Sequence, residues 1–321
     1  LYLDENITFY MNLLYNIIYH PTINKLLRNI NYVLSPILPS KIKLYPTGKL
    51  KIRMESVGSI YFKTNQTSFL TRELFWKGPE KFEFTKIFIK LIKKADVFID
   101  IGANIGNHTI AFSKYAKKVY AFEPNKKVFE VLKLNTDNIK NVEIFNYGAS
   151  SKKQSIIAKI PKLNCGGGSI DNKIKSKDKN NFHNSIFKLI PLDKFKQIQN
   201  KKISLIKIDI EGHELQAFKG MKFILKKNKP IILFEQNREI FNGGSEVISF
   251  LKSVGYNNLY ELKKVDNWIL KKYAPKIFKF VFEFIEVLII GEPINKLKLK
   301  SINNLTKKSY DMLVMSCSRI F

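Results

Sequence analysis

The chain is poor in cysteine and contains no long uncharged apolar run, and each shortage excludes a class of protein. Its two cysteines, Cys165 and Cys317, lie far apart in a sequence of 321 residues. They share no CxxC spacing, so neither a disulfide framework nor a zinc site is expected. No apolar run reaches the roughly 20 residues of a membrane-spanning helix, and the first residues are acidic where a secretory signal would be basic. We therefore expect two free thiols and a cytoplasmic location.

Acidic residues are also few relative to basic ones, and the formal net charge is +28 at pH 7. A charge of this size can indicate a nucleic-acid, membrane-surface or acidic partner. However, the lysines are spread along the chain among abundant asparagine and isoleucine, as the composition bias of an AT-rich genome produces. We therefore predict no nucleic-acid partner, although binding to RNA or DNA would remain testable through its salt dependence.

Two parts of the chain are predicted. Residues 1–85 show a loosely helical pattern over 5–35 and alternation typical of a β-hairpin over 41–63, with a turn near residues 46–48, and we interpret them as an N-terminal extension. Residues 86–321 form the second domain, in which short apolar strands alternate with amphipathic helices. The expected strands are 97–100, 118–122, 142–146, 203–209, 231–235 and 310–316, and the expected helices are 110–115, 126–138, 214–226 and 246–254. This alternation predicts an α/β fold with a mostly parallel sheet and helices on both faces.

Two segments interrupt the alternation. Residues 155–200 are polar and rich in lysine and asparagine, and residues 264–308 read as an insertion. The insertion contains an apolar stretch, 277–290, with three charged residues on one helical face. We expect this stretch to pack on the protein's own core; a dimer interface and a weak contact with a membrane surface are the alternatives.

A strand that runs into a glycine-containing loop is the most informative segment. It reads Asp100-Ile-Gly-Ala-Asn-Ile-Gly106, followed by Asn107. Ligands of open α/β sheets bind at the carboxyl ends of strands, where Gly102 permits a tight turn and Gly106 a close approach. The G-x-x-x-G spacing differs from the G-x-G-x-x-G that binds the pyrophosphate of NAD. S-adenosylmethionine carries an amine, a carboxylate and a sulfonium instead, so an acid such as Asp100 beside the loop favours this cofactor.

The next strand ends in Glu123, one β-α-β step after Asp100. A carboxylate at this place can accept hydrogen bonds from both hydroxyls of a ribose. Pro124 suits the first turn of the helix that follows. We assign Glu123, Pro124 and Ala149 to the cofactor site, together with Asp100, Gly102, Asn104, Gly106 and Asn107.

Charged residues also gather at the end of the strand 203–209. Alternation sends Lys207, Asp209 and Glu211 to one side, where three charges need partners or a function. Asp209 and Glu211 are expected beside the cofactor loop, and Lys207 can pair with a carboxylate. Glu235, at the end of the following strand, adds an acid to the same edge of the sheet. We predict Lys207 and Glu235 at the acceptor substrate.

These motifs resemble the successive blocks of the FkbM methyltransferase family. The resemblance extends over about residues 70–262, and the matching runs, in the family's order, are Asp100–Gly106, Ala121–Asn125, Pro191–Asp193, Ile206–Glu214 and Ile231–Glu235. It implies a Rossmann-like class I methyltransferase with seven strands, the last of them antiparallel. It also implies transfer of a methyl group from S-adenosyl-L-methionine to an oxygen, often on a sugar or polyketide hydroxyl. The acceptor would thus be a glycan or another small molecule.

His213 is our candidate for the general base that removes the acceptor's proton, with Asp209 or Glu211 orienting it or the substrate. We predict no metal, although Asp209, Glu211 and Glu235 could supply oxygen ligands to Mg²⁺. Two other classes of protein remain open: a dinucleotide-binding enzyme on the same fold, and an inactive binding homologue.

Overall fold

The computed structural model describes residues 48–54, 58–64, 96–161, 182–236, 241–266, 295–303, 305 and 310–320. The chain divides into two compact units, one made of 1–66, 70–82 and 264–296, and the other of 67–69, 83–263 and 297–321. The predictions for residues 5–35, Cys165 and 277–290 lie outside the described residues, and the domain boundary at 85/86 stays a prediction. Cys317 is a free thiol. None of the described helices is both long and apolar enough to cross a membrane.

The first unit contains an antiparallel hairpin of β1 (Gly48–Met54) and β2 (Gly58–Thr64). Met54 pairs with Gly58 where the two strands are connected. Residue 48, which was expected in a turn near 46–48, already belongs to β1, and residues 46 and 47 lie outside the described residues.

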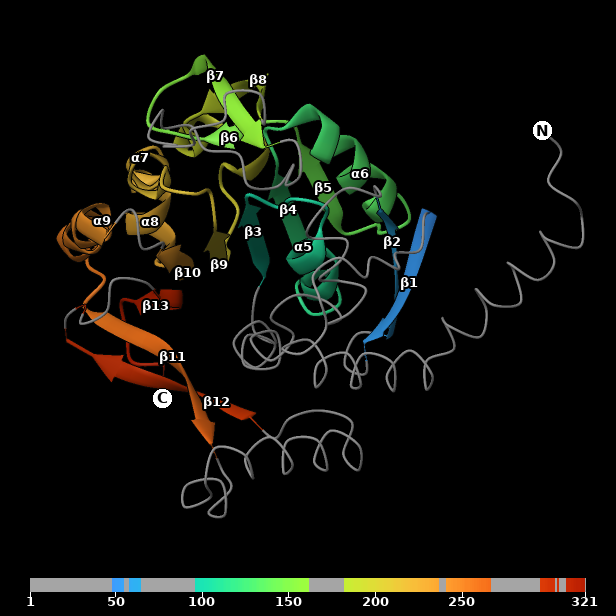
Figure 1. The fold of residues 1–321 in the computed structure, drawn as a ribbon. Helices are drawn as coiled ribbons and strands as arrows, with labels where there is room; N and C mark the ends of the chain where they lie inside the picture. The colour runs from blue at the N-terminus through green and yellow to red at the C-terminus, as the bar shows by residue number, and fades with distance from the viewer. Residues whose placement is uncertain are drawn as a thin grey trace, which may run out of the picture. The chain divides into compact units, whose positions relative to one another are not determined.

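The second unit contains an eight-stranded sheet, coloured from teal to red along the chain in Figure 1. Its spatial order is β12 (Asn295–Ile302), β11 (Asn258–Asp266), β13 (Tyr310–Ser316), β10 (Ile231–Gln236), β9 (Ile203–Ile208), β3 (Val97–Ile101), β4 (Lys118–Phe122) and β5 (Val142–Phe145). Strands β10, β9, β3, β4 and β5 are parallel, whereas β13 runs antiparallel to both of its neighbours. The prediction of a mostly parallel sheet with an antiparallel last strand is confirmed. The eighth strand, β12, comes from the segment 264–308 and extends the edge beside β11.

The strand order determines on which face of the sheet each helix lies. From β3 the chain moves outward through α5 (Asn107–Ser113), β4 and α6 (Lys126–Thr136) to β5. From β9 it moves the opposite way, through α7 (Glu214–Lys219), α8 (Lys222–Asn228), β10 and α9 (Phe241–Ser253). Because parallel crossovers are right-handed, opposite directions place the two groups of helices on opposite faces, as Figure 1 also shows. The reversal between β3 and β9 is the place where such sheets bind ligands.

Both faces of the central strands are buried. On one face Ile99, Ile101, Ile206 and Ile208 join a cluster with residues of α7 and α8, among them Phe218 and Leu225. On the other face Phe98 meets Phe112 of α5 edge to face, with ring centroids 4.9 Å apart. Burial on both sides explains why these strands read as nearly continuous apolar runs.

A three-stranded sheet, which the sequence did not predict, interrupts the alternation. It consists of β6 (Gly148–Ala149), β8 (Phe182–Ile190) and β7 (Gln154–Pro161), in that order. Its buried face is small and contains Ala158, Ile160, Phe187 and Leu189. Ile157 and Ile186, each 66% exposed, lie on the opposite face, and these apolar residues obscure the alternation in the sequence.

Gly220 divides the helix expected over 214–226 into α7 and α8. A Cβ atom at Gly220 would lie 1.9 Å from the carbonyl oxygen of Ser150, so the close approach of this loop requires glycine at the break between the two helices. The expected start of α5 at residue 110 is also corrected, since the helix begins at Asn107 directly after the glycine loop.

Candidate active site

The carboxyl ends of β3, β4 and β9 are tied together by backbone hydrogen bonds. The N–H groups of Gly102 and Ala103 both donate to the carbonyl oxygen of Phe122, each at 3.0 Å. The N–H group of Asp209 donates to the carbonyl oxygen of Ile101 at 3.1 Å. These bonds gather the glycine loop, the start of the Glu123 segment and the start of the Asp209 segment at one edge of the sheet.

Gly102 is required by the close approach of two chain segments. Its φ angle is +76°, and a Cβ atom there would lie 2.0 Å from the carbonyl oxygen of Asp209. Gly106 has a φ angle of +99°, but the nearest obstacle to a Cβ atom is the end of the Leu132 side chain at 2.9 Å. A flexible side chain can move and a backbone carbonyl of a sheet-bound segment cannot, so Gly102 is the more restrictive position.

Glu123 is held in the loop by two backbone donors. Its Oε2 accepts from the N–H group of Asn104 at 3.0 Å, and its Oε1 accepts from that of Asn125 at 2.8 Å. The side chain is buried, and burial raises its pKa to about 7 in spite of these two hydrogen bonds. A carboxylate offers about four acceptor positions. The remaining positions suit the vicinal hydroxyls of a nucleoside, so the residues present fit the expected adenosyl group.

Asp100 and Lys207 lie beneath the loop as a buried pair. Thr109 Oγ1 donates to Asp100 Oδ2 at 2.7 Å, and Lys207 Nζ lies 3.5 Å from Asp100 Oδ1. The same ammonium donates to the carbonyl oxygen of Gly102 at 3.1 Å and lies 3.7 Å from Asp209 Oδ2. The expected pairing of Lys207 with a carboxylate is therefore confirmed.

Electrostatics keep this ammonium charged. Burial lowers the pKa of Lys207, but the charges of Asp100, Asp209 and Glu235 outweigh burial, and the pKa lies above its ordinary value. Asp100 itself is fully buried, so its carboxylate supports the loop from below. Direct contacts of Asp100 with a cofactor and of Lys207 with an acceptor stay predictions.

The segment after β9 is a tight turn, not a continuation of the strand. The strand ends at Ile208, and Glu211 and Gly212 have φ angles of +51° and +101°. Both Ile210 N–H and Gly212 N–H donate to Glu214 Oε1, at 3.3 Å and 3.1 Å. The alternation that placed Lys207, Asp209 and Glu211 on one side therefore holds for the first two and is wrong for Glu211. Burial also raises the pKa of Glu214 to about 7.

The matching family model for this chain is the methyltransferase FkbM domain, which covers residues 100–257. These residues form an FkbM methyltransferase domain. The hexuronic acid methyltransferase AglP of Haloferax volcanii is 29% identical over 150 residues, which are 46% of this chain and 59% of AglP. The chain thus spans little more than half the length of this relative.

Two further proteins are similar to parts of this chain. A probable ribosomal RNA small subunit methyltransferase A of Pyrococcus furiosus is 38% identical over 82 residues, or 26% of this chain and 27% of that protein. The crystal structure of an FkbM methyltransferase from Methylobacillus flagellatus covers 77% of this chain and 52% of its own, at 12% identity and a TM-score of 0.37. At that score the superposition carries no functional argument.

The remaining predicted residues of the FkbM domain lie around the same edge. Asn107 is buried at the start of α5. Asn125 is the N-cap of α6, so Pro124 precedes the cap, and its expected place in the first turn is wrong. Ala149 is buried in β6. A Cβ atom added to the neighbouring Gly148 would lie 3.4 Å from the side chain of Pro124. Glu235, at the end of β10, acts on Lys207 through its charge.

Asp209, Glu211 and Glu235 do not form a metal site. In the described ranges, no three His, Cys, Asp or Glu side chains lie close enough together to hold a metal ion. These three residues therefore do not come together as the Mg²⁺ site that the sequence left open.

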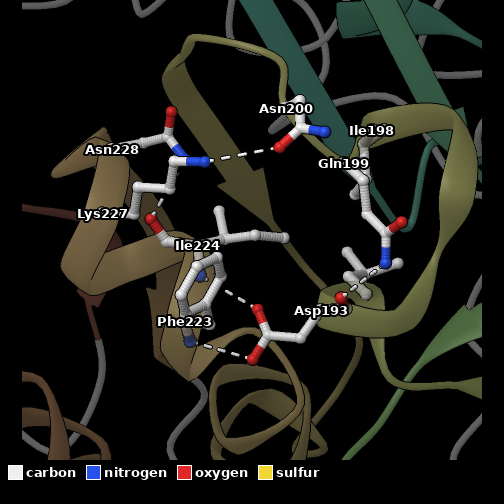
Figure 2. Close-up of a pocket in the computed structure, with 9 residues that line it drawn as sticks. Asp193, Ile198, Gln199, Asn200, Phe223, Ile224, Lys227 and Asn228 are labelled. Atoms are coloured by element: carbon white, nitrogen blue, oxygen red, sulfur yellow. Dashed lines mark hydrogen bonds between the residues drawn. The ribbon is translucent and has the colours of Figure 1, made fainter.

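A pocket of about 140 Å³, shown in Figure 2, has no residue of the glycine loop in its lining. It is lined by the short 3-10 turns η2 (Leu192–Lys194) and η3 (Lys196–Ile198) and by α8. Asp193 accepts from the N–H groups of Phe223 and Ile224, at 2.8 Å and 2.9 Å, and so caps α8. The Pro191–Asp193 motif thus has a structural use, and the pocket contains none of the predicted site residues.

Proposed function

We propose that the chain transfers a methyl group from S-adenosylmethionine to a hydroxyl of a sugar or glycan. The observation that carries this proposal is the Glu123 carboxylate, held by Asn104 and Asn125 N–H groups beside a loop that only a glycine at 102 permits. Its free acceptor positions match the two hydroxyls of a ribose. In the FkbM domain, Gly102, Asn104, Gly106 and Asn107 would shape the cofactor site.

S-adenosylmethionine supplies an electrophilic methyl carbon on a cationic sulfur. The residues of the chain must align the acceptor oxygen with that carbon and remove its proton as the new carbon–oxygen bond forms. In this proposal His213, at the start of α7, accepts the proton of the acceptor hydroxyl, and Asp209 and Glu211 line the reaction centre. Lys207 holds the glycine loop and Asp209 in place through its contacts of 3.1 Å and 3.7 Å.

A hexuronic acid is the acceptor to test first, because the relative from Haloferax volcanii is named for that substrate. The short similarity to a probable ribosomal RNA methyltransferase makes RNA the contrasting acceptor. Incubation with S-adenosylmethionine labelled in its methyl group, and with either uronic-acid oligosaccharides or ribosomal RNA, separates the two. Label in the sugar supports the proposal, and label in RNA alone refutes it.

The cofactor is tested by titration calorimetry of the full chain. S-adenosylhomocysteine should bind and NAD should not, and Glu123→Ala should abolish the binding. Glu130→Ala is the matched control, because Glu130 is an exposed carboxylate on α6 away from the loop. Binding of NAD in place of S-adenosylhomocysteine would overturn the cofactor assignment.

A further inference from the structure

The most informative contact outside the cofactor loop joins two segments far apart in the sequence. His213 Nε2 lies 3.0 Å from Ser150 Oγ. Ser150 follows β6 and is only 1% exposed, and its N–H group donates to the carbonyl oxygen of Ile190 in β8 at 2.9 Å. The serine is therefore held from the three-stranded sheet, and the histidine side chain is directed at it.

Two further contacts press the same loop against α7. Ser151 Oγ donates to Gln216 Oε1 at 2.8 Å. A Cβ atom on Gly220 would lie 1.9 Å from the carbonyl oxygen of Ser150, so only a glycine permits this approach. The loop is thus fixed at both ends of α7, which restricts the position of the Ser150 hydroxyl relative to the imidazole.

A hydroxyl at this distance can accept from Nε2–H or donate to Nε2, according to the tautomer of the ring, and only the first arrangement is compatible with a neutral histidine that acts as a general base. A neutral imidazole has one N–H group, and the hydrogen bond of one nitrogen sets the role of the other. When Nε2–H donates to Ser150 Oγ, the lone pair is on Nδ1, and Nδ1 is then the atom that accepts a proton. Burial of Ser150 excludes it as a nucleophile toward a substrate, so its use is to orient its neighbour.

We propose that Ser150 is the positioning residue for His213: its buried hydroxyl accepts from Nε2–H and fixes the tautomer in which Nδ1 takes the proton of the acceptor hydroxyl. The proposal rests on the proposed function, because it assigns His213 the part of general base. It follows the general arrangement in which a base is oriented by a third group. The carboxylates next to His213 in the sequence are Asp209, Glu211 and Glu214, and Glu214 is engaged in holding the turn.

The first test needs no substrate. Nitrogen-15 NMR of the histidine-labelled full chain reports the tautomer and pKa of each of the four histidines, and His213→Gln identifies the signal of His213. The Nε2–H tautomer of His213 should predominate in the unmodified protein, and Ser150→Ala should remove this preference. Ser253→Ala, at an exposed serine at the end of α9, is the control and should leave the signal unchanged. A predominant Nδ1–H tautomer, or an unchanged tautomer in Ser150→Ala, overturns the proposal.

The second test asks whether Ser150 acts through His213. Ser150→Ala should lower kcat about 10- to 100-fold, below the 100- to 10,000-fold that a general base contributes. It should leave the Kd of S-adenosylhomocysteine within twofold, and Ser150→Thr, which restores a hydroxyl, should recover part of the rate. In a His213→Gln background Ser150→Ala should have no further effect.

An equal loss in both backgrounds would mean a purely structural serine and would overturn the proposal. A chain that binds no S-adenosylhomocysteine would refute the proposed function instead. The NMR outcome does not depend on that binding, so the two failures are distinguishable.

Discussion

Acidification should weaken binding of S-adenosylhomocysteine through a single carboxylate. Burial raises the pKa of Glu123 to about 7, and only the ionised form offers acceptors to both ribose hydroxyls. The apparent Kd rises in inverse proportion to the ionised fraction. That fraction falls from about 0.9 at pH 8 to about 0.5 at pH 7 and about 0.1 at pH 6, which follows from the pKa. The expected Kd is therefore about tenfold higher at pH 6 than at pH 8.

Glu123→Gln is the decisive variant. The amide keeps one acceptor oxygen but turns an NH₂ group toward the N–H group of Asn104 or Asn125, both of which donate to the native carboxylate. Loss of a charge-assisted hydrogen bond costs about 1.5–3 kcal/mol, so at pH 8 the Kd should rise at least tenfold. The dependence on pH should disappear, because the variant has no carboxyl at this position.

Titration calorimetry at pH 8, 7 and 6, at constant ionic strength, measures both effects. Glu130→Ala serves as the control, and it should retain the tenfold pH dependence. A native Kd that stays constant from pH 8 to pH 6 would refute the reasoning. The same slope in Glu123→Gln would assign the titration to another group, for which Glu214, whose pKa burial also raises to about 7, is the candidate.

Four further changes test the contacts beneath and beside the loop, each by urea unfolding of the full chain. Gly102→Ala should lower the unfolding free energy by at least about 2 kcal/mol, because its Cβ would lie 2.0 Å from a backbone oxygen at a positive φ angle; a change below about 0.5 kcal/mol would contradict this. Lys207→Met should cost about 3–5 kcal/mol by leaving the buried Asp100 carboxylate without its cation, and adding Asp100→Asn should recover part of the loss. Asp193→Ala should cost about 1–2 kcal/mol, since two N–H groups of α8 lose their cap, without affecting S-adenosylhomocysteine binding. Burial raises the pKa of Glu214 from 4.5 to about 7, so protonation of this carboxyl stabilises the fold below about pH 4.5, and the contribution is lost as the pH rises through 7. Glu214→Gln should therefore stabilise the protein by up to about 3 kcal/mol at pH 8 and hardly at pH 4.5. An equal effect of this substitution at both pH values would refute the assignment.

The sequence by itself determined the alternation of strands and helices over residues 97–146 and 203–254, apart from the break at Gly220, and the position of the last strand. It also identified the loop from Asp100 to Gly106 and the acid at Glu123. These features are local, because a buried strand, a glycine turn and an acid at a strand end each leave a pattern within a few residues. The small sheet of β6, β7 and β8 was missed because its buried face is narrow and its other face exposes two isoleucines, Ile157 and Ile186, which break the alternation of apolar and polar residues.

Only the tertiary structure decided which of these residues meet. Lys207 reaches Gly102 across 105 positions and Ser150 reaches His213 across 63. Such pairs depend on β9 lying next to β3 and on α7 lying against the loop after β6, and no local pattern encodes which segments become neighbours. The turn at Glu211 is held locally by the Glu214 side chain, an acceptor role that the strand alternation did not reveal. The approach of Gly102 to Asp209 was hidden because it joins two segments that meet only once the sheet has assembled.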